Sequence, residues 1–297
     1  MTQQPKIIVI VGPTASGKTS LSIQLAKTYH GEIISADSRQ VYRGLNIGTG
    51  KVTTKEMDGI PHHLLDVADP NDTYTVADYV RDADEAITHI ISRDKIPVIV
   101  GGTFLYIDAL LGKITTPNVS PNETFRKEME TVSNDDLVAR LKTLDHERHA
   151  HIDIHNRRRL IRALEIVDAR GSVPKQKPIV RYSALILGID IEKETLHTHI
   201  HTRLLNRMEG GMLTEAMTLY ENGLSYERME DLGLEYRYLA RYLQNKITYE
   251  VMLNEIETKS MQYAKRQMTW LKRDTSIHWF SVHDTSGIES TITHFLS

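Results

Sequence analysis

Cysteine is absent from the 297 residues of this sequence. Its absence excludes disulfide bonds, thiol catalysis and thiolate metal sites, and it is typical of proteins in a reducing cytosol. Long apolar runs are missing as well. The longest near the start is Ile7–Val11, far short of the ~18 residues that a membrane helix needs. We therefore expect no membrane segment and a cytoplasmic location.

The sequence also lacks an excess of positive charge. It has 36 Lys and Arg against 39 Asp and Glu, a formal net charge of −3. This balance argues against bulk affinity for nucleic acid but leaves room for a local basic patch. A hydrophobic content of 40% is ordinary for a globular protein with a full core. The length fits two domains of ~150 residues each, or one large α/β domain with an insertion.

Short apolar runs alternate with helical patterns over the first hundred residues, which favours βαβ units and a parallel sheet. The strands expected there are Lys6–Val11, Glu32–Ala36, His63–Val67 and Ile96–Val100, and the helices are Lys18–Tyr29 and Thr75–Arg93. Later in the chain, Ala184–Ile191 predicts a strand that returns to the sheet, and Glu192–Leu271 is helical again. Ile277–Val282 predicts a last edge strand.

A complete phosphate-binding loop follows the first predicted strand. Residues 12–19 read GPTASGKT and match G-x-x-x-x-G-K-[ST] between a strand and a helix. In such a loop, backbone N–H groups and the helix N-terminus surround phosphate oxygens. Lys18 adds a point charge, and the Thr19 hydroxyl can ligate Mg²⁺; the alternative is a glycine-rich turn without a ligand. The predicted diphosphate-binding residues are Gly12, Pro13, Thr14, Ala15, Ser16, Gly17, Lys18 and Thr19.

The insertion comes between about Thr115 and Tyr182, where strand patterns disappear. Glu123–Val132 and Asp135–Leu144 predict amphipathic helices, and the basic run HNRRRLIRALEIVDARG predicts another. The expected architecture is an α/β fold with a P-loop NTPase-like parallel sheet and flanking helices, made of residues 1–114 and 184–297. An all-helical domain of residues 115–183 is inserted into it.

The segment ADSRQVY (36–42) places Asp37 at the carboxyl edge of the predicted sheet, where open α/β sheets bind ligands. A carboxylate there can hold Mg²⁺, orient a nucleophile or act as a general base. The alternative is an N-cap that begins a short helix. Thr103 follows Gly101 and Gly102 at the end of another strand. It can make a polar contact at the same edge or simply cap the next helix.

Several motifs in a fixed order resemble the bacterial tRNA dimethylallyltransferases, also called tRNA isopentenyltransferases. They are GPTASGKT (12–19), ADSRQVY (36–42), GIPHHLLD (59–66), VGGTFLY (100–106), NRRRLIRALE (156–165) and AKRQMTWLKR (264–273). The resemblance covers most of the chain. It implies transfer of a dimethylallyl group from dimethylallyl diphosphate to the exocyclic N6 amine of the adenosine directly 3′ of the tRNA anticodon. Where this family usually has a Gly-Tyr pair, residues 232–237 read LGLEYR.

The resemblance also implies a site in which the phosphate-binding loop of residues 12–19 holds a prenyl diphosphate rather than ATP. Asp37 would accept the proton of the adenine amine, while Lys18, Mg²⁺ at Thr19 and a nearby arginine would neutralise the leaving diphosphate. Thr103 completes the catalytic set. The predicted contacts to the tRNA anticodon loop are Asp37, Ser38, Arg39, Gln40, Thr103, Arg126, Arg158, Arg159, Leu160, Ile161 and Arg162. A monomer is expected.

The basic run of the insertion can be interpreted in two ways. Arg158 and Arg162 are four residues apart and share a helical face, so they can meet RNA phosphates, whereas Arg159 points ~100° away from Arg158 and can be structural. Alternatively, the run is a solvated face partnered by Glu165 and Asp168. Further basic residues are Lys175, Lys177, Arg181, Lys265, Arg266, Lys272 and Arg273. The last four flank Trp270, which is itself expected in the core.

The spacing of the histidines does not predict a metal site. His197, His199 and His201 alternate, and on a helix this spacing spreads them too widely for one ion. His62 and His63 are adjacent and are assigned a structural or substrate-lining role. We therefore predict no zinc.

Three other functions are compatible with parts of the sequence. A small-molecule P-loop kinase would have no use for the basic insertion, and an isopentenyltransferase acting on free adenylate would not need to grip RNA. A regulatory GTPase would need an N-K-x-D segment, which this sequence does not have.

Overall fold

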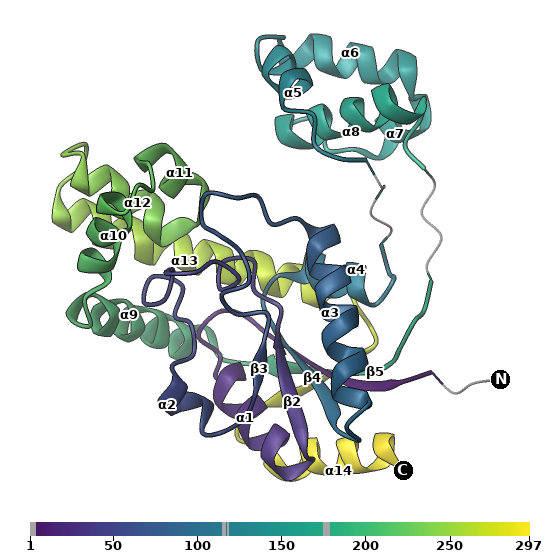
Figure 1. Cartoon of the computed structure of the whole chain (residues 1–297), viewed down its shortest axis with the longest axis vertical. Coiled ribbons are helices and arrows are strands. Elements are labelled where there is room, and N and C mark those ends of the chain that lie inside the picture. The colour runs from purple at the N-terminus through teal and green to yellow at the C-terminus, as the bar shows by residue number, and fades with distance from the viewer. Residues whose placement is uncertain (1–3, 115–116, 118, 175–178) are drawn as a thin grey trace. The chain divides into compact units, whose positions relative to one another are not determined.

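The computed structural model describes residues 4–114, 117, 119–174 and 179–297. The chain forms two compact units, one of Met1–Gly112 with Val180–Ser297 and one of Lys113–Ile179 (Figure 1). The second unit is thus inserted between two halves of the first. Of the predicted insertion limits, Thr115 lies outside the described residues, and residue 183 belongs to the first unit.

A six-stranded sheet forms the centre of the first unit. Its strands are β1 (Lys6–Val11), β2 (Gly31–Ser35), β3 (His62–His63), β4 (Ile96–Gly101), β5 (Ser183–Asp190) and β6 (Ile277–Ser281). They lie in the order β3-β2-β4-β1-β5-β6, and all neighbouring pairs are parallel. The predicted α/β class with a parallel sheet is confirmed. Parallel sheets need helices on both faces, which explains the almost continuous apolar character of β1 and β4.

Ten helices belong to this unit in the part of the chain that the structure describes. They are α1 (Lys18–Thr28), α2 (Thr54–Met57), α3 (Val76–Ile91), α4 (Phe104–Leu110), α9 (Lys193–Glu209), α10 (Met212–Glu221), α11 (Tyr226–Asp231), α12 (Leu234–Leu243), α13 (Tyr249–Leu271) and α14 (Thr285–Leu296). No helix among the described residues is both long and apolar enough to cross a bilayer.

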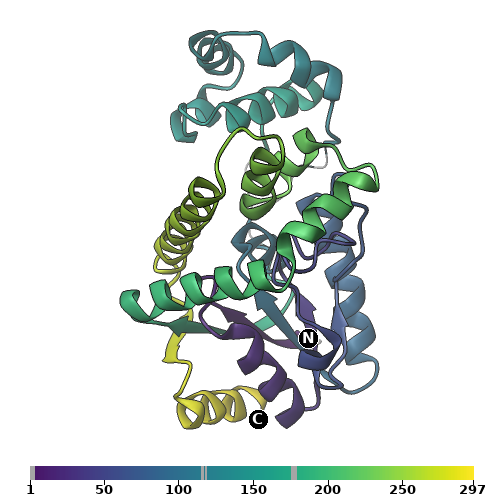
Figure 2. The ribbon, with the colours of Figure 1, turned by 90° about the vertical axis from the view of Figure 1, so that its left-hand side faces the viewer.

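Alternate residues of β1 point to opposite faces of the sheet, as the period of a strand requires. Ile7 and Val9 pack with α3 and α4, whereas Ile8 and Ile10 pack with α1 and α14. Helices α1 and α14 therefore lie side by side on one face although they come from opposite ends of the chain (Figure 2). Helices α9–α13 form a third core with the segment after β2, around residues such as Tyr42, Met212 and Tyr236.

Two sequence predictions for this unit need correction. The strand predicted over His63–Val67 ends at His63, because Leu64 and Asp66 have φ of 61° and 56°, values that a strand does not allow. Trp270 is 42% exposed instead of lying in the core, and its Nε1–H donates to Asp108 Oδ2 over 3.0 Å.

The inserted unit is all helical within the residues described. Its helices are α5 (Glu123–Glu130), α6 (Asn134–Leu144), α7 (His146–His151) and α8 (Arg157–Arg170). Leu137 and Leu141 of α6 pack against Leu160 and Leu164 of α8 to form its own core. Helix α7 has no buried residue, so it offered no apolar period from which the sequence could predict it.

Candidate active site

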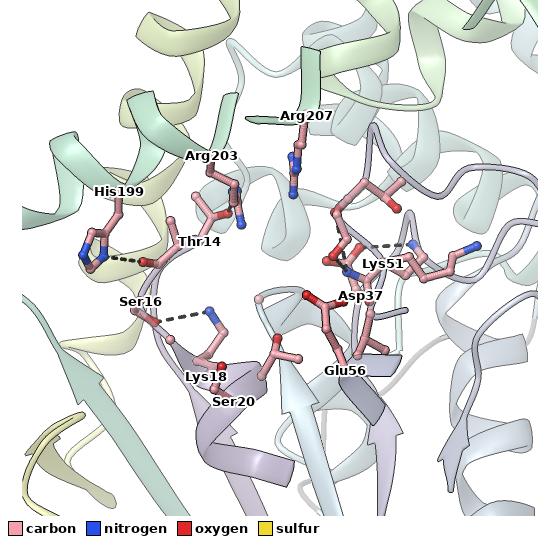
Figure 3. Close-up of a pocket in the computed structure, with 18 of the residues that line it drawn as sticks. Thr14, Ser16, Lys18, Ser20, Asp37, Lys51, Glu56, His199, Arg203 and Arg207 are labelled. Atoms are coloured by element: carbon pink, nitrogen blue, oxygen red, sulfur yellow. Dashed lines mark hydrogen bonds between the residues drawn. The ribbon is translucent and has the colours of Figure 1, made fainter. Parts of the chain in front are cut away.

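A pocket of about 920 Å³ lies at the carboxyl edge of the sheet (Figure 3). Its walls come from the phosphate-binding loop, the segment after β2, the end of β4, and one face each of α9 and α13. The predicted residues that line it are Thr14, Ala15, Ser16, Gly17, Lys18, Thr19, Asp37 and Gln40. Gly12, Pro13, Ser38, Arg39 and Thr103 do not line it but lie in the same segments.

The phosphate-binding loop turns sharply between β1 and α1. Gly17 has φ of 86° at the N-cap of α1, a conformation that glycine adopts without steric cost. Gln267 of α13 holds the loop from outside, because its Oε1 accepts from Thr14 N–H over 2.8 Å while its Nε2–H donates to Gly102 O over 3.0 Å. Gln267 is buried and joins the loop to the end of β4. No local pattern signals this role, since the partners of Gln267 are distant in the chain.

The amine of Lys18 folds back onto its own loop. Its Nζ donates to Pro13 O over 2.5 Å and contacts Ser16 Oγ at 3.5 Å. Removal from water and the charge of Arg203 lower the pKa of Lys18 to about 7, although Asp37 opposes this shift. A diphosphate would add the negative charge that favours the protonated amine.

Helix α9 presents three basic side chains at intervals of four residues, so they share one face. His199 contacts Ala15 O at 3.2 Å, Arg203 donates to Thr14 Oγ1 over 2.5 Å, and Arg207 donates to Gly48 O over 3.3 Å. Figure 3 shows Arg203 and Arg207 pointing from α9 into the pocket, toward Lys18 and Asp37.

Arg203 is among the pocket residues that the sequence analysis did not predict, together with Arg207 and Gln267. Removal from water and the neighbouring Arg207 lower the pKa of Arg203 to about 10, against the opposing charges of Glu235 and Asp37. No ion pair of Arg203 occurs among the residues that the structure describes, whereas Arg207 reaches Glu235 Oε1 at 3.3 Å. Positions 199, 203 and 207 are spaced four residues apart in the sequence, and this spacing predicts that their side chains share one face of a helix.

Asp37 caps a turn and lines the pocket, and no helix begins after it in the described residues before α2, whose N-cap is Thr53. Its Oδ1 accepts from the backbone N–H of Arg39 over 2.8 Å and of Gln40 over 3.3 Å, which caps the turn after β2. The same side chain lines the pocket. Because the cap holds the carboxylate by one oxygen, the second oxygen can face a ligand.

Thr103 holds that turn from the side of β4. Its Oγ1 accepts from Ser38 N–H over 3.0 Å and donates to Ser38 Oγ over 3.3 Å. Thr103 also occupies the N-cap position of α4, as the alternative prediction expects, but its hydroxyl makes no capping bond to that helix. Thr103 therefore connects the end of β4 with the segment that carries Asp37.

The basic residues of the insertion divide into two groups. Glu165 is buried and accepts from Arg126 Nε–H over 2.9 Å, and Arg162 pairs with the same carboxylate. Arg162 also donates to Val119 O over 2.7 Å. Although burial alone would raise the pKa of Glu165, bonds from Arg126, Asn122 N–H and Arg162 hold it below its usual value. Arg126 and Arg162 thus have structural partners within the unit.

The remaining predicted contacts of α8 differ in exposure. Arg158 and Arg159 are both exposed, and the structural role considered for Arg159 stays a prediction. Leu160 and Ile161 are buried in the helical core, so their side chains do not form part of a surface for RNA. Lys175 and Lys177 lie outside the described residues, and Arg181 pairs with Asp84 of the first unit.

Arginine and aromatic side chains alternate along α13 and the turn after it. The Arg266 guanidinium lies 5.8 Å from the ring centroid of Tyr263, and that of Arg273 lies 5.9 Å from the ring centroid of Trp270. Tyr263 lines the pocket. Such pairs are suited to stack with unpaired bases.

The donor set of the pocket fits Mg²⁺ better than zinc. No group of three or more His, Asp and Glu side chains that could hold a metal ion occurs among the described residues. The Thr19 hydroxyl and the Asp37 carboxylate line the pocket. Mg²⁺ is usually held by one or two such oxygens together with substrate phosphates, so a cluster of protein ligands is not required.

Comparisons with known proteins show the family to which this chain belongs. The family model described as IPP transferase matches residues 40–274. The tRNA dimethylallyltransferase 1 of Geotalea uraniireducens is 41% identical over 277 residues, covering 92% of this chain and 91% of the relative. The tRNA dimethylallyltransferase of Bacillus subtilis is 38% identical over 291 residues, covering 95% and 92%.

Solved structures have the same fold. The tRNA isopentenylpyrophosphate transferase of Bacillus halodurans is similar with a TM-score of 0.74 and 36% identity, covering 99% of this chain and 96% of that one. A eukaryotic dimethylallyltransferase, determined in crystallographic snapshots of its action on tRNA, gives a TM-score of 0.83 at 29% identity. It covers 98% of this chain and 77% of that one.

Proposed function

This chain belongs to the IPP transferase family, and we propose that it transfers a dimethylallyl group from dimethylallyl diphosphate to the N6 amine of the adenosine directly 3′ of a tRNA anticodon. One observation carries the proposal: the pocket sets two cations, Lys18 and Arg203, opposite the Asp37 carboxylate. No ion pair of either cation is found within the described residues.

The cation side of the pocket suits a leaving diphosphate. In the reaction the bond between the allylic carbon and the diphosphate oxygen breaks, and the negative charge that develops on that oxygen must be stabilised. Lys18, Arg203 and the backbone N–H groups of the phosphate-binding loop would stabilise this charge, and the contacts of Lys18 with Pro13 O and of Arg203 with Thr14 Oγ1 keep both cations beside that loop. Mg²⁺, held by Thr19 and the diphosphate, would supply further charge neutralisation.

The opposite side of the pocket suits an acceptor amine. The lone pair of an adenine amine is delocalised into the ring, so loss of a proton during attack assists the reaction. The new carbon–nitrogen bond forms as this proton moves to Asp37, whose turn is fixed by Thr103 and by its own backbone bonds. To reach this point the base must leave the stacked anticodon loop. The alternating side chains of α13 and the exposed Arg158 and Arg159 are the proposed RNA contacts.

The deciding experiment uses radiolabelled dimethylallyl diphosphate with tRNA or with AMP as the acceptor. We expect label in tRNA and none in AMP, and Asp37→Asn should lower the single-turnover rate by ~10²–10⁴ with unchanged diphosphate binding. Label in AMP alone would support the free-adenylate alternative. Turnover of ATP at ~1–100 s⁻¹ would support a kinase. A normal rate for Asp37→Asn would remove Asp37 from the chemistry.

A further inference from the structure

The loop of residues 46–50, called the 46–50 loop below, forms one wall of the pocket through Asn46, Ile47, Thr49 and Gly50. It belongs to no helix or strand. Its internal bonds are few, among them Gly50 N–H to Ile47 O over 3.0 Å and Thr49 Oγ1 to Asn46 O over 3.1 Å. Its position must therefore come from the elements that hold it.

A single carboxylate outside the pocket lining holds this loop. Glu215 of α10 accepts from Asn46 N–H over 3.1 Å and from Ile47 N–H over 2.7 Å at Oε2. Its Oε1 accepts from Gly48 N–H over 2.9 Å and from the Tyr236 hydroxyl over 2.6 Å. Successive backbone N–H groups that converge in this way form an anion-binding nest, and here the anion is part of the chain. With four donors, the carboxylate is fully used.

The loop also packs closely against two neighbouring helices. A Cβ added at Gly48 would lie 2.6 Å from the ring of Tyr236, and one added at Gly50 would lie 1.6 Å from Nη2 of Arg207. Arg207 donates in turn to Gly48 O over 3.3 Å. The backbone therefore fits one position between α9 and α12. Tyr236 and Glu235, in the segment that departs from the Gly-Tyr pair of the family, both belong to this support.

Gln40 connects the 46–50 loop with Asp37. Its side-chain Nε2–H donates to Gly50 O over 3.3 Å, and its backbone N–H donates to Asp37 Oδ1 over 3.3 Å. A shift of the loop would therefore reach the turn that holds the carboxylate.

We propose that Glu215 is a positioning residue, which sets the 46–50 loop and through Gln40 the orientation of Asp37. The inference rests on the proposed function, because the position of Asp37 matters for a transfer that it assists. The diphosphate side of the pocket is built from other segments. Loss of Glu215 should consequently affect the chemical step and leave diphosphate binding intact.

The test compares Glu215→Gln with the matched control Glu221→Gln, whose side chain is exposed on the same helix. An amide in place of the carboxylate puts an NH₂ group against backbone donors. We expect kcat for transfer to tRNA to fall about 10- to 100-fold, the effect of a ~1 Å misplacement, while the Kd of pyrophosphate with Mg²⁺ does not change. Tyr236→Phe removes one of the four donors and should give a smaller loss.

Hydrogen exchange supplies a readout that does not depend on activity. In wild type the amides of residues 46–48 should exchange slowly, and in Glu215→Gln they should exchange faster while the phosphate-binding loop keeps its protection. If Glu215→Gln fails to fold, Glu215→Asp, which keeps the charge but is one methylene shorter, should give the same pattern. Unchanged kcat and exchange, or a parallel loss of pyrophosphate binding, would overturn the inference. A wild type that transfers no prenyl group contradicts the proposed function instead, and the exchange data still decide on the loop.

Discussion

Arg203 in the pocket and Arg162 in the inserted unit are both half-buried, yet they have different partners. Arg203 meets the Thr14 hydroxyl, while Arg162 shares the buried carboxylate of Glu165 with Arg126. The pKa values reflect this difference. Removal from water lowers the pKa of Arg203 to about 10, whereas the two arginines keep the pKa of Glu165 below its usual value despite burial.

An arginine without a carboxylate partner in the described part of the chain, such as Arg203, thus differs from an arginine that is paired with a buried carboxylate, such as Arg162. A half-buried charge without a counter-charge costs free energy, which an arriving anion recovers as binding. A cation that already shares a buried carboxylate gains little from a further anion, and its removal leaves the carboxylate short of partners. The positions of charged residues in the sequence cannot distinguish an arginine that binds a ligand from one that pairs with a buried carboxylate, because both lie on helices with several basic residues.

Removal of Arg203 should produce the largest effect. We expect Arg203→Gln to lower the rate of transfer by ~10²–10³, the usual effect of losing one preorganised group that stabilises developing charge. The free energy of unfolding should hold or rise, since an uncompensated charge is removed. Single-turnover transfer and thermal unfolding measure the two quantities. Arg81→Gln, 59% exposed on α3, is the control. If Arg203→Gln were destabilised but fully active, Arg203 would have a structural role like that of Arg162 and no role in the transfer.

The pH dependence of Lys18 should produce a smaller effect. Its pKa of about 7 in the free site is below the ordinary lysine value of 10.5, so the unfolded chain binds more protons between these pH values. The contribution of Lys18 to the free energy of unfolding therefore rises with pH across this window. Pyrophosphate needs the charged amine, so affinity should fall up to ~10-fold per pH unit above 7. Titrations of wild type and Lys18→Met isolate this slope, since pyrophosphate itself titrates equally in both.

The exposed arginines of α8 should give the smallest effect. Arg158→Ala with Arg159→Ala should flatten the log–log salt dependence of tRNA binding by about 0.7 to 0.9 for each phosphate that is no longer neutralised. Arg162→Ala should instead lower the stability of the inserted unit by about 1 to 2 kcal/mol, because the buried Glu165 carboxylate loses one of its charged partners while Arg126 remains. Binding over a salt series and calorimetry on both variants decide this. The reverse pattern would assign the RNA contact to Arg162.

Local sequence patterns were sufficient to predict the central strands and the phosphate-binding loop. The short apolar runs predicted β1 and β4 closely, and the glycines and Lys18 of residues 12–19 predicted the loop between β1 and α1. The parallel sheet then implied that Asp37 and the loop lie at one edge, since carboxyl ends of parallel strands meet there. The strand predicted after His63 failed because two residues with positive φ cannot be detected from apolar character.

Long-range contacts decided the rest. Arg203 reaches Thr14 across 189 positions of sequence, Gln267 reaches the same residue across 253, and Glu215 reaches Ile47 across 168. No local pattern encodes such pairs, because they depend on how α9, α10 and α13 pack beside the sheet. The sequence by itself determined the phosphate-binding loop, the strands beside it and the place of Asp37 at the sheet edge. Only the tertiary structure decided which arginines keep a free charge for a ligand and which are neutralised by a buried glutamate, since partner choice is a property of packing in space.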